Sequence, residues 1–149
     1  MDILSSEDKK KLATDLTTPI HILESFSKDK DWEVRVRVAW NPIAPIHVLE
    51  KLSKDKHWNV RINVAGTRNA PPHVLETMSK DKDSHVRYRV ARNPSTPPHV
   101  LEALSKEEEG YVRGSVARNP NTPTHVLESL SKDEDRDVRE TATRTLEDL

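Results

Sequence analysis

The sequence predicts an all-α fold in which tandem pairs of short helices stack into a solenoid. Three observations support this prediction: a strict 26-residue period, helical spacing of the apolar residues within it, and a composition suited to a thin core. Five prolines mark the period, because they follow one another at intervals of 26 residues: Pro19, Pro45, Pro71, Pro97 and Pro123. A fixed period of this length is typical of proteins whose units bury their apolar faces only against their neighbours.

The composition agrees with a thin core. Hydrophobic residues make up 34% of the 149 residues and charged residues 33%, whereas roughly 45–50% of an average domain is apolar when glycine is counted. The 24 basic and 25 acidic residues give a net charge of −1. This balance excludes a uniformly basic nucleic-acid binder, although it allows one basic face.

Several classes of protein are excluded by what the sequence lacks. There is no cysteine, which excludes disulfides, a thiol nucleophile and cysteine-ligated metal centres. No apolar run approaches the ~18 residues of a membrane span, and the N-terminal residues lack the apolar core of a signal peptide. We therefore expect a cytoplasmic protein that does not bind membranes.

Residues 1–18 are predicted to form an N-terminal cap. The stretch 12–19 falls in register with 38–45 of the first repeat, so we interpret residues 5–16 as a lone second helix. Its three consecutive lysines are expected to lie in solvent: Lys9, Lys10 and Lys11.

Four full repeats of two helices follow, at residues 19–44, 45–70, 71–96 and 97–122. The first helix opens at a Thr-Pro or Ala-Pro step, as at Thr96-Pro97, with threonine as the cap and proline at the first helical position. A polar link follows, and the second helix of the first repeat is expected to stop near Asn41-Pro42, because proline disfavours helix at the residue before it. Helices of about nine residues cannot stand alone, so some turns are expected to be 3₁₀.

A strand is the alternative for the second segment, since apolar residues alternate from Trp32 to Trp40. The other copies favour a helix. The position of Val36 is taken by Ile62, Tyr88, Gly114 and Glu140, whereas the positions of Val34 and Val38, four residues apart, stay apolar in every copy. The last repeat, 123–149, lacks the Asn-Pro pair and is expected to end in a longer helix that caps the C-terminal end.

The block from Asn93 to Glu102, together with Asp31–Arg35 and Val90–Pro94, resembles the leucine-rich repeat variant (LRV) family. The resemblance covers residues 17–145. It implies a right-handed superhelix of alternating α- and 3₁₀-type helices without β-sheet, and it implies no agreed activity. Some members carry a cysteine-ligated iron–sulfur cluster, which this chain without cysteine cannot hold.

One histidine recurs in each repeat, at His21, His47, His73, His99 and His125. Equivalent atoms of adjacent repeats should lie ~9 Å apart, too far to share a zinc ion. We therefore expect neutral imidazoles that bond the cap or the adjacent link, rather than a metal site. No glycine-rich phosphate loop or Ser-His-acid set stands out, so we predict no catalytic residue and no cofactor.

The Val-Arg arginines and the glutamates of the Leu-Glu pairs also occur once in each repeat. The arginines are Arg35, Arg61, Arg87, Arg113 and Arg139, and the glutamates are Glu24, Glu50, Glu76, Glu102 and Glu128. Such regularity favours a structural ladder, in which guanidinium groups bridge carboxylates between helices, over a ligand site. The charged links 54–56 and 107–109 are expected to be solvated.

All twelve arginines, and no lysine, lie in the five second-helix windows 32–42, 58–68, 84–94, 110–120 and 136–146. The windows hold only three acidic residues, so they carry a net charge of +9 against −10 for the rest of the chain. The predicted outer stripe of these helices also displays Val36, Ile62 and Tyr111. Its partner-binding residues are predicted to be Arg37, Trp40, Tyr88, Arg89, Arg92, Arg118 and Arg144.

Arginine with tyrosine and tryptophan is the composition of protein–protein hot spots. We therefore predict a non-enzymatic scaffold that docks a protein of acidic or mixed surface, with Trp40 as the aromatic anchor. Three alternatives stay open. The same stripe suits nucleic acid or another polyanion, a solvated basic face needs no ligand, and Trp40, Val36 and Ile62 could join two copies of the chain.

Overall fold

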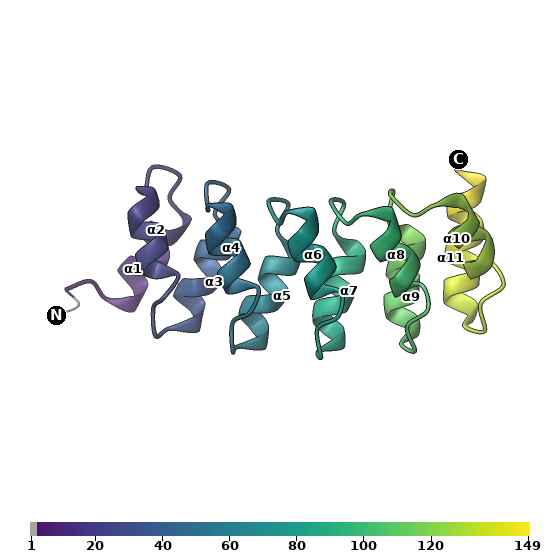
Figure 1. The fold of residues 1–149 in the computed structure, drawn as a ribbon, viewed down its shortest axis with the longest axis horizontal. Coiled ribbons are helices and arrows are strands. Elements are labelled where there is room, and N and C mark those ends of the chain that lie inside the picture. The colour runs from purple at the N-terminus through teal and green to yellow at the C-terminus, as the bar shows by residue number, and fades with distance from the viewer. Residues whose placement is uncertain (1–2) are drawn as a thin grey trace. The chain divides into compact units, whose positions relative to one another are not determined.

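The structure is a computed structural model, and it describes residues 3–149. Within that range the chain forms eleven α-helices and no strand (Figure 1), which confirms the predicted all-α class. The helices are α1 (Ser6–Thr14), α2 (Ile20–Phe26), α3 (Trp32–Trp40), α4 (Ile46–Leu52), α5 (Trp58–Gly66), α6 (Pro72–Met78), α7 (Ser84–Arg92), α8 (Pro98–Leu104), α9 (Gly110–Arg118), α10 (Thr124–Leu130) and α11 (Arg136–Glu147).

The helices follow the predicted alternation of a first and a second helix. Each first helix, from α2 to α10, has seven residues, and each second helix from α3 to α9 has nine. The resemblance implies 3₁₀-type helices, but both members of every pair are α-helices. Bonds of the 3₁₀ kind occur at helix ends, as from the Val48 amide to the Pro45 carbonyl. The right-handed superhelix stays a prediction.

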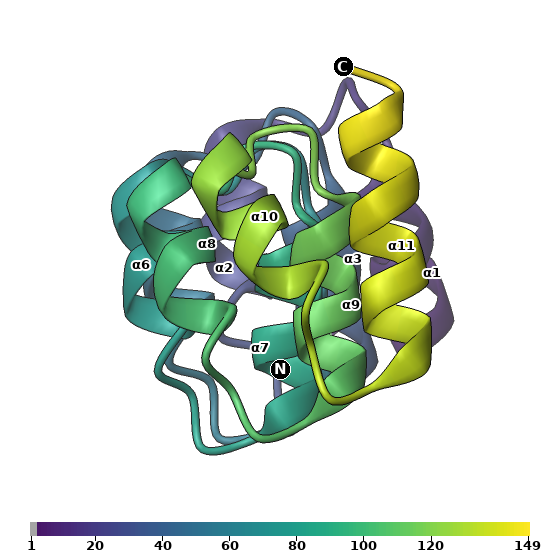
Figure 2. The ribbon, with the colours of Figure 1, turned by 90° about the vertical axis from the view of Figure 1, so that its right-hand side faces the viewer.

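The chain falls into two compact units, and the boundary between residues 74 and 75 lies inside α6. In the first unit, α3 packs directly against both α1 and α5, and α2 and α4 contact these helices. In the second unit, α9 packs between α7 and α11, whereas α8 and α10 contact them from one side (Figure 2). Each unit therefore has a closely packed layer of second helices. The single domain over 1–149 stays a prediction.

The core of each unit is built from the columns of apolar residues that the repeats share. Val34 and Val38 are fully buried, as are Leu101 and Leu127 on first helices of the second unit, to within 1%. Seven-residue helices are too short to be stable in water by themselves. Burial of this one apolar face is therefore what holds each first helix in place.

The polar residues at the helix ends repeat as regularly as the core. Asp31 begins α3 by accepting a hydrogen bond from the Glu33 amide at 2.9 Å, and Asp83 and Asp135 begin α7 and α11 in the same way. The serine after each first helix donates to the carbonyl oxygen three residues earlier, at 2.6–2.7 Å. These bonds explain the recurring Ser-Lys step.

The threonine of the Thr-Pro step does not cap the helix that follows it. Thr96 Oγ1 donates instead to the Val90 carbonyl at 2.6 Å, at the end of the preceding second helix, and Thr18 and Thr122 make the equivalent bonds. The proline itself is the N-cap residue and offers no side-chain hydrogen bond. The predicted threonine cap is therefore wrong, because the hydroxyl serves an orphan carbonyl of the preceding helix.

The predicted N-terminal cap helix is α1, but its lysines are not all in solvent. Lys9 is 5% exposed and its Nζ lies 2.7 Å from Asp29 Oδ2, and Lys10 pairs with Glu33. Only Lys11 is exposed. The expectation fails because Lys9 stands 26 residues before Arg35 and takes the place of that arginine against the first link.

Ile62 is also not on the exposed stripe, since only 8% of it is accessible. Its equivalent in the second unit, Gly114, is also buried. A Cβ built on Gly114 would lie 3.8 Å from Val138 of α11, so at this position α9 lies against α11. A self-association surface that includes Ile62 is therefore wrong.

Candidate partner-binding site

The Val-Arg arginines form the predicted structural ladder. Arg35 donates from Nη1 to the carbonyl of Asp29 in its own link at 2.6 Å. Its Nε and Nη2 donate to the two carboxylate oxygens of Asp55 in the next link, at 2.7 and 3.0 Å. The hydrogen bonds with Asp55 raise the pKa of Arg35 above its ordinary value. The Arg35 guanidinium therefore fastens α3 to two links.

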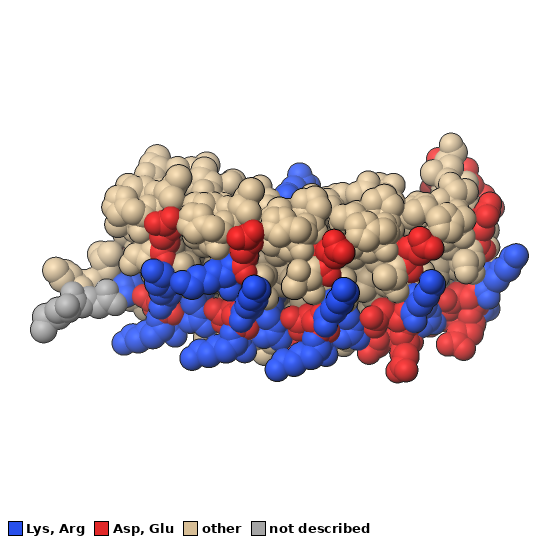
Figure 3. Space-filling model, viewed as in Figure 1, with Lys and Arg blue, Asp and Glu red and all other residues tan. Residues whose placement is uncertain are grey.

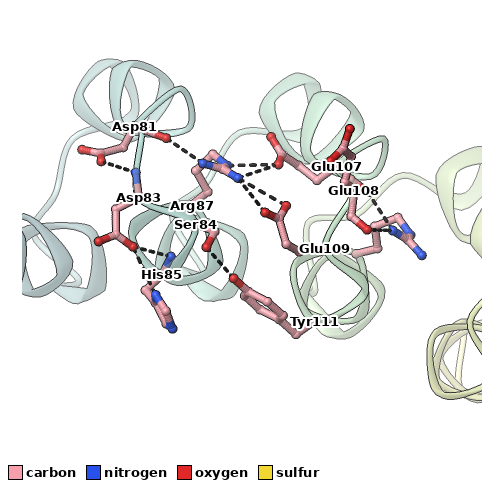
Figure 4. Close-up of polar contacts among 10 residues, drawn as sticks. Asp81, Asp83, Ser84, His85, Arg87, Glu107, Glu108, Glu109 and Tyr111 are labelled. Carbon is pink, nitrogen blue, oxygen red and sulfur yellow. Dashed lines mark hydrogen bonds and ion pairs between the residues drawn. The ribbon is translucent and has the colours of Figure 1, made fainter.

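The second unit repeats this arrangement (Figure 4). Arg87 bonds the carbonyl of Asp81 in its own link and the carboxylates of Glu107 and Glu109 in the next. Arg113 holds Asp133 in the same way, at 2.8 and 2.9 Å. The prediction that the links 54–56 and 107–109 are only solvated is therefore wrong. Asp55 in the first of these links bonds Arg35, and Glu107 in the second bonds Arg87.

The recurring histidines bond a glutamate of the preceding repeat rather than the cap or link. His47 Nε2 lies 2.7 Å from Glu24 Oε1, and His73 Nε2 lies 2.6 Å from Glu50 Oε1. The equivalent pairs of the second unit, at His99 and His125, are 3.5 Å apart. These pairs are exposed, and residues 3–149 contain no group of three His, Cys, Asp or Glu residues that could hold a metal ion.

Figure 3 shows the face that carries the first helices. Within each unit, its charged side chains gather at the edge where the links lie, and the opposite edge is mostly uncharged. The five arginines of the ladder lie on the second helices and each donates to a backbone carbonyl of its own link. Most of the predicted site residues are the other arginines, on the exposed side of the second helices.

Three predicted site residues line one hollow in the second unit. The hollow has a volume of about 390 Å³ and lies between α7 and the end of α9. Its lining residues are Tyr88, Arg92, Ser115, Arg118, Asn119 and Pro120. Neither α7 nor α9 contains an acidic residue, so the two guanidinium groups share this hollow without a carboxylate on either helix.

The two arginines of the hollow are held differently. Arg92 Nη1 donates to Tyr88 Oη at 2.6 Å, and its Cζ lies 5.5 Å from the centre of the tyrosine ring. The ring therefore fixes the direction of the Arg92 guanidinium. Arg118 is exposed and forms no hydrogen bond or ion pair with any residue from 3 to 149.

An aromatic cluster supports Tyr88 from the other side. The ring of Tyr111 lies 5.8 Å from that of Tyr88 in an edge-on arrangement, and its hydroxyl donates to Ser84 Oγ at 2.6 Å (Figure 4). The imidazole of His85 stacks on Tyr111 at 6.1 Å. The Tyr88 ring is thus held between the Arg92 guanidinium and the Tyr111 ring.

The other predicted residues lie elsewhere. Arg37 and Trp40 line a separate hollow of about 340 Å³ in the first unit, together with Glu33 and Asn63. Trp40 is 49% exposed, and its indole nitrogen donates to the Asn63 side chain. Arg144 lines a third hollow, beside Glu140 and Glu147. Arg89 is exposed on α7 without lining any of these hollows.

Sequence reasoning missed Ser115 and Asn119 as lining residues. Asn119 is 3% exposed and its amide donates to the carbonyls of Ala91 and Asn93, so it shapes the floor of the hollow. The signal was present in the Asn-Pro pair that follows Arg118, since this pair must turn the chain at the hollow.

No protein-family model matches the chain, and the comparison with curated proteins gives no match. The fold is similar to that of an engineered protein from the Northeast Structural Genomics Consortium, with a TM-score of 0.54 and 18% identity over 95% of this chain and 88% of the other. A second engineered protein of that consortium gives 0.53 and 18% over 97% and 55%. A leucine-rich repeat variant with a novel repetitive structural motif gives 0.47 and 22% over 97% and 68%.

The chain has a helical-repeat fold. In such a fold, residues that recur in every copy maintain the contacts between copies. The position of Trp40 does not recur in this way, because the equivalent residues are Gly66, Arg92, Arg118 and Arg144. The contacts between copies therefore do not require a tryptophan there. The helices from residue 3 to 149 include none with the length and apolarity needed to span a membrane.

Proposed function

We propose that the chain is a non-enzymatic scaffold that docks an acidic segment of a protein partner on α7 and α9. One observation carries the proposal: Arg92 and Arg118 share a hollow on two helices without acidic residues. A carboxylate of the partner would pair with the positive charges of Arg92 and Arg118 in this hollow. The exposed Arg89 adds a third cation on α7. Tyr88 and Tyr111 supply the aromatic area that is common in hot spots.

A protein segment fits these helices better than a nucleic-acid strand does. A strand carries one charge per nucleotide and needs a continuous row of cations. In the second unit the hollow around Arg144 is lined by two arginines, Arg139 and Arg144, and by two acidic residues, Glu140 and Glu147. These acids would repel successive phosphates, whereas a short acidic segment could stop before them.

Trp40 and Arg37 form a second proposed contact, in the first unit. Half of the Trp40 side chain is available to a partner, and its bond to Asn63 holds the indole in place. Substitution Trp40→Ala tests this contact. If Trp40 instead joins two copies of the chain, light scattering will show an oligomer for the wild type and a monomer for the variant.

The docking proposal is tested with two double variants of equal charge. Arg92→Gln/Arg118→Gln alters the hollow, and Lys106→Gln/Lys132→Gln removes two exposed link lysines as the control. A partner is captured with the wild type, purified, and titrated against all three proteins by calorimetry. We expect the arginine variant to bind at least tenfold more weakly and the lysine variant to bind within twofold of the wild type. Equal affinities of the two variants would contradict the proposal.

A second titration separates protein from nucleic acid. Labelled single-stranded and double-stranded DNA and RNA are titrated at about 50 and 200 mM salt. We expect no saturable binding at the higher salt. Micromolar binding that persists with one nucleic acid, and that Arg92→Ala and Arg118→Ala weaken, would replace the protein partner by a polyanion.

A further inference from the structure

We infer that the hollow between α7 and α9 is a recognition site for a single phosphate monoester, carried by a phosphorylated side chain of the partner. The inference rests on the proposed function, since it names the group that the docked segment inserts. It follows from the hydrogen-bonding capacity of the residues that line the hollow, from the number of cations there, and from the limits of the cationic surface.

The lining offers donors to a ligand and almost no acceptor. Arg118 has all its N–H groups free of partners among residues 3–149, and Arg92 uses only Nη1, toward Tyr88 Oη. Because Tyr88 Oη accepts that bond, its own O–H proton is available to a ligand. The ligand that satisfies three such donors is an oxyanion with several acceptor oxygens.

The two polar residues at the floor are already engaged. The amide nitrogen of Asn119 donates to the carbonyls of Ala91 and Asn93, and its oxygen accepts from the Asn121 amide. Ser115 Oγ donates its single proton to the Tyr111 carbonyl at 2.9 Å. These residues therefore shape the hollow and leave recognition to the arginines and the tyrosine.

Two guanidinium groups without a carboxylate favour a dianion. A phosphate monoester carries −1.5 to −2 charges near pH 7 and three strong acceptor oxygens, whereas a carboxylate carries one charge and two oxygens. Two arginines can each bind such a phosphate through two parallel hydrogen bonds. A volume of about 390 Å³ is at the small end of ligand sites, roughly 300–1,000 Å³, and suits one side chain with its head group.

The surroundings favour one phosphate rather than a chain of them. Beyond Arg118, the next exposed arginine of the same column is Arg144, which shares its hollow with Glu140 and Glu147. In the second unit, Arg92 and Arg118 are thus the two arginines of this column that share a hollow without an acidic lining residue. A single phosphorylated side chain matches this extent, and a nucleic-acid strand does not.

Small probes test the inference directly on the intact chain. Phosphotyrosine, phosphoserine, inorganic phosphate and glutamate are titrated at constant ionic strength, and the Nε–Hε signals of the arginines are followed by NMR. We expect the signals of Arg92 and Arg118 to shift saturably with the phosphate probes. The affinity should exceed that for glutamate at least tenfold, and Arg118→Gln should weaken it at least tenfold. Phosphotyrosine or phosphoserine binding more tightly than inorganic phosphate identifies the side chain as the source.

The matched control is Arg136→Gln, which removes an exposed arginine of α11 that pairs with Glu140 instead of lining the hollow. It should leave the affinity unchanged. Equal affinity for glutamate and phosphate, or shifts spread over all exposed arginines, would overturn the inference. The proposed function would survive that result if the purified partner still needs Arg92 and Arg118, and would fail with it if the partner binds the arginine double variant normally.

Discussion

The pairing of Arg113 with Asp133 shows what one residue of the ladder contributes. Both side chains are 9% exposed, and the shortest contact between them is 2.8 Å. The hydrogen bonds from Arg113 hold the pKa of Asp133 below its ordinary value of 3.8. A carboxyl group whose folded-state pKa is lowered stabilises the fold above its unfolded pKa, and this contribution is lost as the pH falls through the folded-state pKa.

We therefore predict that Asp133→Asn lowers the free energy of unfolding by about 2 kcal/mol at pH 7. The difference from the wild type should shrink as the pH falls below 3.8. Urea unfolding at several pH values between about 3 and 7 measures it. The control is Glu108→Gln, an exposed link acid whose side chain bonds no residue from 3 to 149. A loss for Asp133→Asn that is constant with pH would contradict the assignment.

The ladder also shows why single residues were harder to predict than helices. The period alone predicts that Arg35 recurs for a structural reason, but it does not name Asp55 as the partner, because the partner comes from another repeat. Lys9 could have been placed by register, since it stands 26 residues before Arg35. Because Lys9 is the first of three consecutive lysines, the sequence predicts that it is exposed. Its burial depends on the ion pair with Asp29, which the sequence does not indicate.

At the level of helices, the second helix of one repeat depends on the asparagine of the next. The amide of Asn119 bonds the carbonyls of Ala91 and Asn93 at the end of α7, at 2.7 and 2.9 Å. In the first unit, Asn41 bonds Ala13 and Asp15 in the same way. Helix ends leave carbonyls without partners, so this asparagine supplies what a buried helix end needs.

We predict that Asn119→Ala lowers the free energy of unfolding by about 3 kcal/mol, because it leaves buried carbonyls without a partner. Asn119→Thr should cost only about 1 kcal/mol. Threonine serves at the equivalent place in the last repeat, where Thr145 Oγ1 donates to the Ala117 carbonyl at 2.8 Å. Urea unfolding at pH 7 compares the three proteins, and equal losses for alanine and threonine would show that the side chain acts by packing alone.

Helix positions were predictable from the sequence because their signals are local. The apolar columns of Val34 and Val38 predict the buried face, and the Asn-Pro pair predicts the ends of α3, α7 and α9. The direction of the Thr96 hydroxyl was not predictable, since both the preceding and the following helix offer it a partner. The hollow at Arg92 and Arg118 depends on the side chains of two repeats, so the sequence predicted its residues as a stripe rather than as a site.

At the scale of each unit, the 26-residue period sets the spacing of the recurring contacts between consecutive copies. Within each unit the arginine bonds an acid about 20 residues ahead, the histidine a glutamate 23 residues behind, and the asparagine a carbonyl 28 residues behind. Each distance is fixed only if the repeats keep equal length. The stability of such a chain is approximately a sum of repeats and of contacts between neighbours.

We therefore predict that a second copy of residues 97–122, inserted after Thr122, folds as a further repeat. Its Arg113 meets Asp133, its His99 meets the first Glu102, and the first Arg113 meets a copy of the 107–109 link, as Arg87 does in the natural chain. Helix content by circular dichroism should rise by the seven and nine residues of α8 and α9, and the melting temperature should not fall. The same insertion without Glu108 has 25 residues. It removes one residue from the 28-residue spacing between Asn119 of the copy and the first Ala117, and one from the 23-residue spacing between Glu102 of the copy and His125. It should unfold at a lower temperature than the natural chain, and a 25-residue insertion that melts with the 26-residue one would show that the ladders do not set the spacing of the repeats.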